Sequence, residues 1–168
     1  MIYCFDTYYF EDKAQTSCVG ISSWESDKAE FELSETINEI SAYESGAFYK
    51  RELPCITSIL KQIDLNPTED IIVIDGFVQL DDFGKKGLGS YLYTFLDSKI
   101  PIIGVAKNNF ATINKLKQEI FRGESIKPLF ITSEGIDLTL ASNNIMQMHG
   151  NYRFPTILKL VDTHCRLI

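Results

Sequence analysis

Three acidic residues and one lysine lie within or at the ends of the strands and helices expected in this chain. Asp6 lies in the apolar segment YCFDTYY, Glu52 lies in KREL, and Asp75 ends the run IIVID. Lys107 directly follows a second apolar run, IPIIGVA. Carboxylate groups are the ligands that Mg²⁺ or Mn²⁺ prefers, and such an ion activates water and neutralises charge on a phosphodiester. These residues indicate metal-assisted phosphodiester hydrolysis if the fold brings them together.

Each acid also has a purely structural interpretation, which the residue types leave open. Asp6 could be a buried polar group with satisfied hydrogen bonds, Glu52 a favourable charge at a helix N-terminus, and Asp75 a turn residue. The elements that carry these residues therefore decide between the two interpretations.

The segment 71–110 predicts a strand, a helix and a second strand. Ile71–Ile74 and Ile100–Val105 are continuous apolar runs, which is typical of strands covered on both faces. The apolar residues between the runs have helical spacing, so we expect a parallel, right-handed crossover; they are Leu88, Leu92, Phe95 and Leu96. Ligands of parallel sheets bind beyond the carboxyl ends of the strands. Asp75 and Lys107 would both lie there.

The remaining pattern predicts three antiparallel strands first and alternating helices and strands afterwards. The strands are expected at 1–10, 16–24 and 30–33, with Ser34 as the N-cap of a helix; further helices are expected at 54–63, 111–121, 138–148 and 155–166, and a strand at 129–132. This order is found in ribonuclease H-like α/β domains, which have a mixed sheet flanked by helices. One domain is expected over residues 1–168, because no long linker or internal repeat interrupts the chain.

Charge and cysteine usage limit the cellular setting without deciding the partner. Residues 1–50 carry ten acidic and three basic side chains, whereas residues 51–168 carry thirteen of each. A local basic surface on the second part is therefore compatible with the net charge of −7. The four cysteines form no CxxC pair, and no apolar run reaches membrane-spanning length. We expect a cytoplasmic monomer with reduced thiols, no signal peptide and no membrane contact.

Several blocks together, in the same order along the chain, resemble the endonuclease V family. The family's VDVSY strand, wedge block PYVPGLLSFREGP and VDGxG strand end correspond to CFDTYY, AYESGAFYKRELP and IDGFV. Its LPTIGVAK block corresponds to IPIIGVAK, with almost every residue retained. Its segments KPVYVSPGH and GYRLPEPTRLADRLAR are similar to RGESIKPLFITSEG and GNYRFPTILKLVDTHCR.

The resemblance implies a metal-dependent endonuclease that cuts 3′ to a deaminated purine, inosine, in DNA or RNA. Asp6, Glu52 and Asp75 would be the carboxylates that hold Mg²⁺ or Mn²⁺, and Lys107 would contact the substrate phosphate. Tyr43 corresponds to the wedge tyrosine, which in the family inserts beside the damaged base while that base is flipped out. Three residues match family glycines and would allow close backbone approach to the substrate or to neighbouring strands; they are Gly46, Gly76 and Gly104.

The departures from the family pattern keep other functions open. Where the family has the histidine of SPGH, this chain has Ile136, and Asp137 is the candidate to supply a catalytic carboxylate there. Ala42 and Ser45 replace the two wedge prolines, so the loop should be less rigid. The alternatives are a related nuclease of altered specificity and an inactive protein that binds nucleic acid or another partner. The three retained acids favour an enzyme, because a buried carboxylate cluster without its cation is electrostatically costly.

Overall fold

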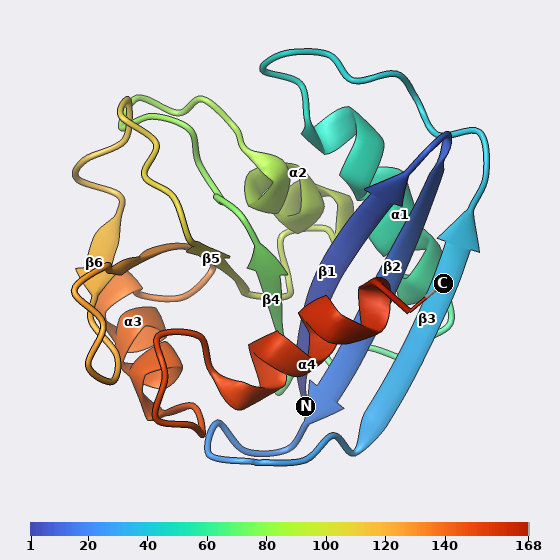
Figure 1. Cartoon of the computed structure of the whole chain (residues 1–168). Coiled ribbons are helices and arrows are strands. Elements are labelled where there is room, and N and C mark those ends of the chain that lie inside the picture. Colours follow the sequence, from blue (N-terminus) through green and yellow to red (C-terminus); the bar gives the residue numbers. More distant parts are fainter. Residues whose placement is uncertain (168) are drawn as a thin grey trace.

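The computed structural model describes residues 1–167 as a seven-stranded mixed sheet with helices on both faces (Figure 1). The strands are β1 (Ile2–Phe10), β2 (Lys13–Ile21), β3 (Phe31–Ile37), β4 (Ile71–Asp75), β5 (Ile102–Ala106), β6 (Gln118–Ile120) and β7 (Leu129–Glu134). The helices are α1 (Tyr49–Leu60), α2 (Leu88–Phe95), α3 (Leu138–Gln147) and α4 (Thr156–Cys165). The sheet order is β3-β2-β1-β4-β5-β7-β6. Three opening antiparallel strands followed by parallel β4 and β5 confirm the predicted ribonuclease H-like order.

The central strands of the sheet are buried on both faces, as the continuous apolar runs of β4 and β5 predict, whereas the edge strand β3 is partly exposed. On one face, β-strand side chains pack with α3 and α4 in a cluster that includes Cys4, Val73 and Ile145. On the other face, they pack with α1 and α2 in a cluster that includes Phe5 and Ile56. Because side chains alternate along a strand, a residue next to Phe5 on β1 faces α4. Figure 1 shows α4 lying across β1 and β2.

Two of the helices expected from the sequence do not form within residues 1–167. Ser34 is not a helix cap but a residue of β3, where its hydroxyl lies 2.6 Å from that of Ser17 on β2. The expected helix over residues 111–121 is absent, and its last part forms β6. The carboxylate of Asp82 accepts the backbone N–H groups of Asn114, Lys115 and Leu116, so these amides do not bond within a helix.

Helix α1 begins at Tyr49, five residues before the expected start at Pro54. Glu52 is therefore a residue of the first helical turn and not of the preceding loop. Among residues 1–167, no helix is both long and apolar enough to cross a membrane.

Candidate active site

Two acids meet at the carboxyl edge of the central strands because β1 and β4 are parallel neighbours. Phe5 is paired with Ile74, so Asp6 and Asp75 follow at the same level of the sheet. The alternation of the strands turns both side chains toward α4. Lys107 belongs to the same edge, since it lies two residues beyond Val105, the partner of Asp75 on β5.

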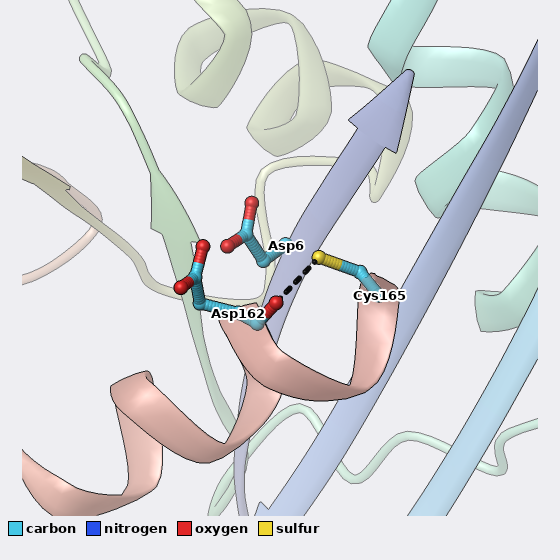
Figure 2. Close-up of side chains that lie close together, drawn as sticks. All are labelled: Asp6, Asp162 and Cys165. Carbon is cyan, nitrogen blue, oxygen red and sulfur yellow. Dashed lines mark hydrogen bonds between the residues drawn. The ribbon is translucent and has the colours of Figure 1, made fainter. Parts of the chain in front are cut away.

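Helix α4 brings a third carboxylate and a thiol to this place. Ligand atoms of Asp6, Asp162 and Cys165 all lie within 4.8 Å of one another, and all three residues are buried (Figure 2). The Cys165 thiol donates a hydrogen bond to the backbone carbonyl of Asp162, with the two atoms 3.1 Å apart. Arg166, one residue after α4, donates two hydrogen bonds to Asp162 Oδ1, at 3.2 and 3.0 Å. The first strand and the last helix of the chain therefore share one site.

Lys107 is held beside this acidic group by α4 and the loop before it. Its Nζ lies 4.0 Å from Asp162 Oδ1 and 4.2 Å from the centre of the Phe154 ring. The side chain is 36% exposed, so the ammonium group is accessible from solvent while it lies among the acids.

Glu52 approaches the same edge from α1, on the opposite face of the sheet. It is 3% exposed, and its pKa is raised well above the usual value by burial first and then by the charges of Asp75 and Asp6. Glu52 therefore lies within electrostatic reach of both strand acids. The four acids come from β1, α1, β4 and α4.

The surroundings of the acids shift their pKa values in different directions. Burial, followed by the charge of Asp75, raises the pKa of Asp6 to about 7. Burial likewise raises the pKa of Asp75, although Lys107 opposes the effect. Burial also disfavours ionised Asp162, but the hydrogen bond from Arg166 and the charge of Lys107 outweigh it, and its pKa is lowered. Burial and the nearby aspartates raise the pKa of the Cys165 thiol to about 12.

The donor set suits a divalent cation. Buried carboxylates that repel one another lose that penalty when a cation binds between them. A small cavity of about 10 Å³ beside Asp6 and Asp75 is lined mainly by apolar side chains, and neither Asp162 nor Cys165 lines it. Oxygen donors suit a small metal ion, and the buried group of Asp6, Asp162 and Cys165 could bind one.

A larger cavity of about 250 Å³ opens beside Asp75 and contains three of the predicted substrate-binding residues. Tyr43, Gly46 and Gly76 line it, together with aromatic and aliphatic residues; the others are Phe48, Tyr49, Phe77, Leu80, Gly87, Leu88 and Phe110. Tyr43 is 65% exposed, so most of its side chain faces solvent. The cavity and the acids share Asp75 as a wall.

Gly104 does not line this cavity but supports its floor from β5. A Cβ atom at Gly104 would lie 2.4 Å from the carbonyl oxygen of Gly76 and 2.6 Å from Thr132 Oγ1. Gly76 itself has φ +124°, a backbone conformation that residues other than glycine rarely adopt. The turn after Asp75 therefore depends on both glycines.

Asp137 is not brought to the acidic group. It follows β7, whose last residue Glu134 pairs with Ile102 at the start of β5, which is the opposite edge of the sheet. Its carboxylate accepts the N–H of Leu140 and caps α3. Ile136, at the position of the family histidine, packs against the apolar core. Neither residue contributes a side chain to the cluster of acids at the other edge.

Asp162 is not among the site residues that the sequence motifs predict. Within a helix of ordinary amphipathic pattern, an aspartate is usually a solvent-facing residue. The usable signal was the similarity of VDTHCR to the family's ADRLAR, which aligns Asp162 with an aspartate. Cys165, in contrast, aligns with alanine, so no such signal marked it.

The fold and this edge define the class of the protein as a ribonuclease H-like domain with an acidic centre on its central strands. The family model of endonuclease V matches residues 1–143. The chain belongs to the endonuclease V family, a family of nucleases.

Solved structures of the family share the fold of this chain. The endonuclease V of Ciona intestinalis, as a variant in complex with an inosine-containing DNA, has a TM-score of 0.80 at 18% identity, covering 98% of this chain and 83% of that one. Human endonuclease V gives 0.76 at 18% identity, with 98% and 82% covered. The Streptomyces avermitilis protein gives 0.73 at 22% identity, with 98% and 79% covered. No curated protein sequence matches the chain.

Proposed function

We propose that this chain is a metal-dependent endonuclease that hydrolyses the phosphodiester 3′ to a deaminated purine, inosine, in DNA or RNA. The observation that supports this most is the group of buried acids where β1 and β4 end their pairing, with Asp162 of α4 beside Asp6. Two similar structures, both of the Ciona intestinalis enzyme, are complexes with DNA that contains an inosine.

Asp6, Asp75 and Asp162 would hold Mg²⁺ or Mn²⁺, with Glu52 approaching from α1. When bound, such an ion supplies an activated water and neutralises charge on the phosphate. The protein's part is to fix the oxygen atoms. Arg166 donates to one oxygen of Asp162, which fixes the orientation of that carboxylate. The backbone N–H of Thr7 does the same for Asp6, at 2.7 Å.

Lys107 would bind a phosphate oxygen of the substrate at this edge. Its ammonium group is partly exposed and lies beside the acids, so a phosphate entering the site would meet both. The Phe154 ring below Nζ limits the directions that the side chain can take.

The cavity between Tyr43, Gly76 and Phe110 would receive the flipped base. Its aromatic lining favours stacking on a planar ring, and it adjoins Asp75, so a base held there places its own phosphate near the acids. Tyr43 would occupy the space that the base leaves in the strand. Unpairing is least costly at a pair already weakened by deamination.

Cleavage of matched oligonucleotides tests this function. End-labelled DNA and RNA strands of one sequence, with and without a single inosine, are incubated with the protein in Mg²⁺ or Mn²⁺. We expect metal-dependent cuts 3′ to inosine and little cutting of the unmodified strands. Equal cutting of both would contradict inosine recognition, and no cutting despite measurable binding would contradict a nuclease.

A related nuclease of altered specificity is the second candidate. It is favoured by Ala42 and Ser45, which replace the wedge prolines, and by a base cavity whose side chains are largely apolar. Such a site would select a base by shape and stacking more than by hydrogen bonds. The same assay with mismatched or other modified bases separates the two, because a broader enzyme would cut those strands as rapidly as the inosine strand.

A further inference from the structure

A thiol lies inside the acidic group of this protein. Cys165 is 1% exposed, and its Sγ is within 4.8 Å of ligand oxygens of both Asp6 and Asp162. Figure 2 shows the three side chains converging between β1 and α4. The hydrogen bond of the thiol to the Asp162 carbonyl is a weak local one, since sulfur is a weak donor.

The position of Cys165 differs from that of the other cysteines. Cys4, Cys18 and Cys55 are equally buried, but none belongs to the group of converging ligand atoms. Cys4 is the most informative comparison, because it lies on the same strand and the same face as Asp6, two residues earlier, among apolar side chains. Burial alone therefore does not bring a thiol to the acids; the crossing of α4 does.

We propose that Cys165 makes this centre a site for thiophilic divalent cations of the Zn²⁺ and Cd²⁺ class, bound by its sulfur together with Asp6 and Asp162. The inference rests on the metal centre of the proposed function and names a second class of ion for it. Thiolate ligands select zinc-like ions, whereas Mg²⁺ is held by oxygen atoms alone.

The charges at the site are compatible with this coordination. Binding breaks the S–H bond, forms a sulfur–metal bond and releases the thiol proton to water, together with the proton that Asp6 holds below its raised pKa. Two carboxylates and a thiolate around a divalent ion leave one negative charge. Lys107, 4.0 Å from Asp162, and Arg166, hydrogen-bonded to it, lie next to that charge. Three protein ligands also leave one position open in a tetrahedral geometry.

Competition between ions follows from the shared acids. Zn²⁺ bound through Cys165 would occupy the oxygen atoms of Asp6 and Asp162 that Mg²⁺ requires. Micromolar Zn²⁺ should therefore inhibit Mg²⁺-dependent cleavage, and removal of the thiol should relieve that inhibition.

Cadmium titration of the protein without nucleic acid tests the inference directly. A thiolate bound to Cd²⁺ gives an ultraviolet charge-transfer band that carboxylates do not give. We expect this band in the wild type and in Cys4→Ala, and no band in Cys165→Ser. Zn²⁺ affinity should fall at least about tenfold in Cys165→Ser, because even loss of an outer partner costs 10- to 100-fold as a rough range. Mn²⁺ affinity should change little.

The spectrum of the wild type alone can overturn the inference. No band at saturating Cd²⁺ would do so, even if Cys165→Ser failed to fold, and so would a band that persists in a folded Cys165→Ser. Cleavage in Mg²⁺ without a cadmium band would leave the proposed function standing and remove the thiol from the site. A cadmium band without any cleavage would support the thiolate ligand and contradict the proposed endonuclease function.

Discussion

Asp6 and Asp162 face the same space, yet their surroundings favour different charges. Burial works against the ionised form of both. Asp75 adds to that effect at Asp6, whereas Arg166 and Lys107 reverse it at Asp162. In the metal-free protein, Asp6 therefore holds a proton more readily than Asp162 does, and Asp162 carries a charge more readily. A cation binding between them would release that proton, which couples metal binding to pH.

Stability without metal should fall as pH rises through the range in which Asp6 ionises. The pKa of Asp6 is raised from 3.8 to about 7, so the folded state binds more protons than the unfolded state between these values. The free energy of unfolding should decrease from pH 4 to pH 7 by on the order of 4 kcal/mol, at about 1.4 kcal/mol per pKa unit. The raised pKa values of Asp75 and Glu52 act in the same direction.

Urea unfolding in a chelator at pH 5 and pH 8 measures this effect. Asp6→Asn should flatten the dependence, and saturating Mg²⁺ should remove it from the wild type. Asp162 acts with the opposite sign but in a lower range, since a lowered pKa affects stability only at acidic pH. A wild type more stable at pH 8 than at pH 5 in chelator would contradict the assigned electrostatics.

At the scale of elements, the site depends on how closely β4 and β5 approach beyond Asp75. The carbonyl of Gly76 lies over Gly104, and Val78 N donates a hydrogen bond of 2.8 Å to Thr132 Oγ1 on β7. The turn that positions Asp75 and one wall of the larger cavity is thus packed directly on the sheet. There is no space for a side chain between them.

Gly104→Ala should therefore impair the site more than its small size suggests. The added Cβ would meet the Gly76 carbonyl and Thr132, and such overpacking costs about 1–3 kcal/mol. We expect a loss of unfolding free energy in that range, and cleavage reduced by at least about tenfold because Asp75 shifts with its turn. Gly20→Ala on β2 is the matched control, since its Cβ would meet the flexible side chains of Met1 and Tyr3 and the Cβ of Phe31 at 3.0–3.3 Å. Equal activity of the two variants would contradict this role for Gly104.

Elements that depend on local sequence could be predicted here, whereas residues placed by distant contacts could not. Continuous apolar runs identified β4 and β5, and their ends placed Asp75 and Lys107 at one edge. The helix expected at 111–121 does not form because the carboxylate of Asp82 accepts three backbone N–H groups of this segment. Asp82 lies about thirty positions earlier in the chain, so no local pattern indicates this contact. Asp162 and Cys165 depend on the path of α4 across β1, which no local pattern contains. Asp137 lies away from these acids for a similar reason, because β7 runs antiparallel to β5.

At the scale of the whole molecule, loops from distant segments are tied together behind the site. The guanidinium of Arg122 is buried and donates to the carbonyls of Met148, Gly150, Tyr152 and Arg153. Arg153 in turn donates to the carbonyls of Lys107 and Pro128. The loop between α3 and α4 is thereby connected to the backbone of Lys107.

Arg122→Lys should loosen this connection. A lysine cannot reproduce the planar fork that reaches four carbonyl groups, and each hydrogen bond from a charged donor contributes about 1.5–3 kcal/mol. We expect a loss of about 2–4 kcal/mol in unfolding free energy, measured by urea denaturation, and weaker cleavage at temperatures where the fold is still intact. Lys99→Met, on the exposed surface, should change stability by less than about 0.5 kcal/mol. Similar stability of the two variants would contradict a stabilising role for the hydrogen bonds from Arg122 to the loop between α3 and α4.

The proposed catalytic acids lie at one edge of the sheet only, and a pair of aspartates tests this placement. Asp75→Asn and Asp137→Asn make the same chemical change at opposite edges, and asparagine preserves the helix cap at 137. The measurement is single-turnover cleavage of an inosine-containing strand in Mg²⁺. We predict that Asp75→Asn loses cleavage by at least about a thousandfold while still binding the strand, and that Asp137→Asn cleaves like the wild type. Cleavage by Asp75→Asn at the wild-type rate, or its loss in Asp137→Asn, would contradict the assignment of the active site.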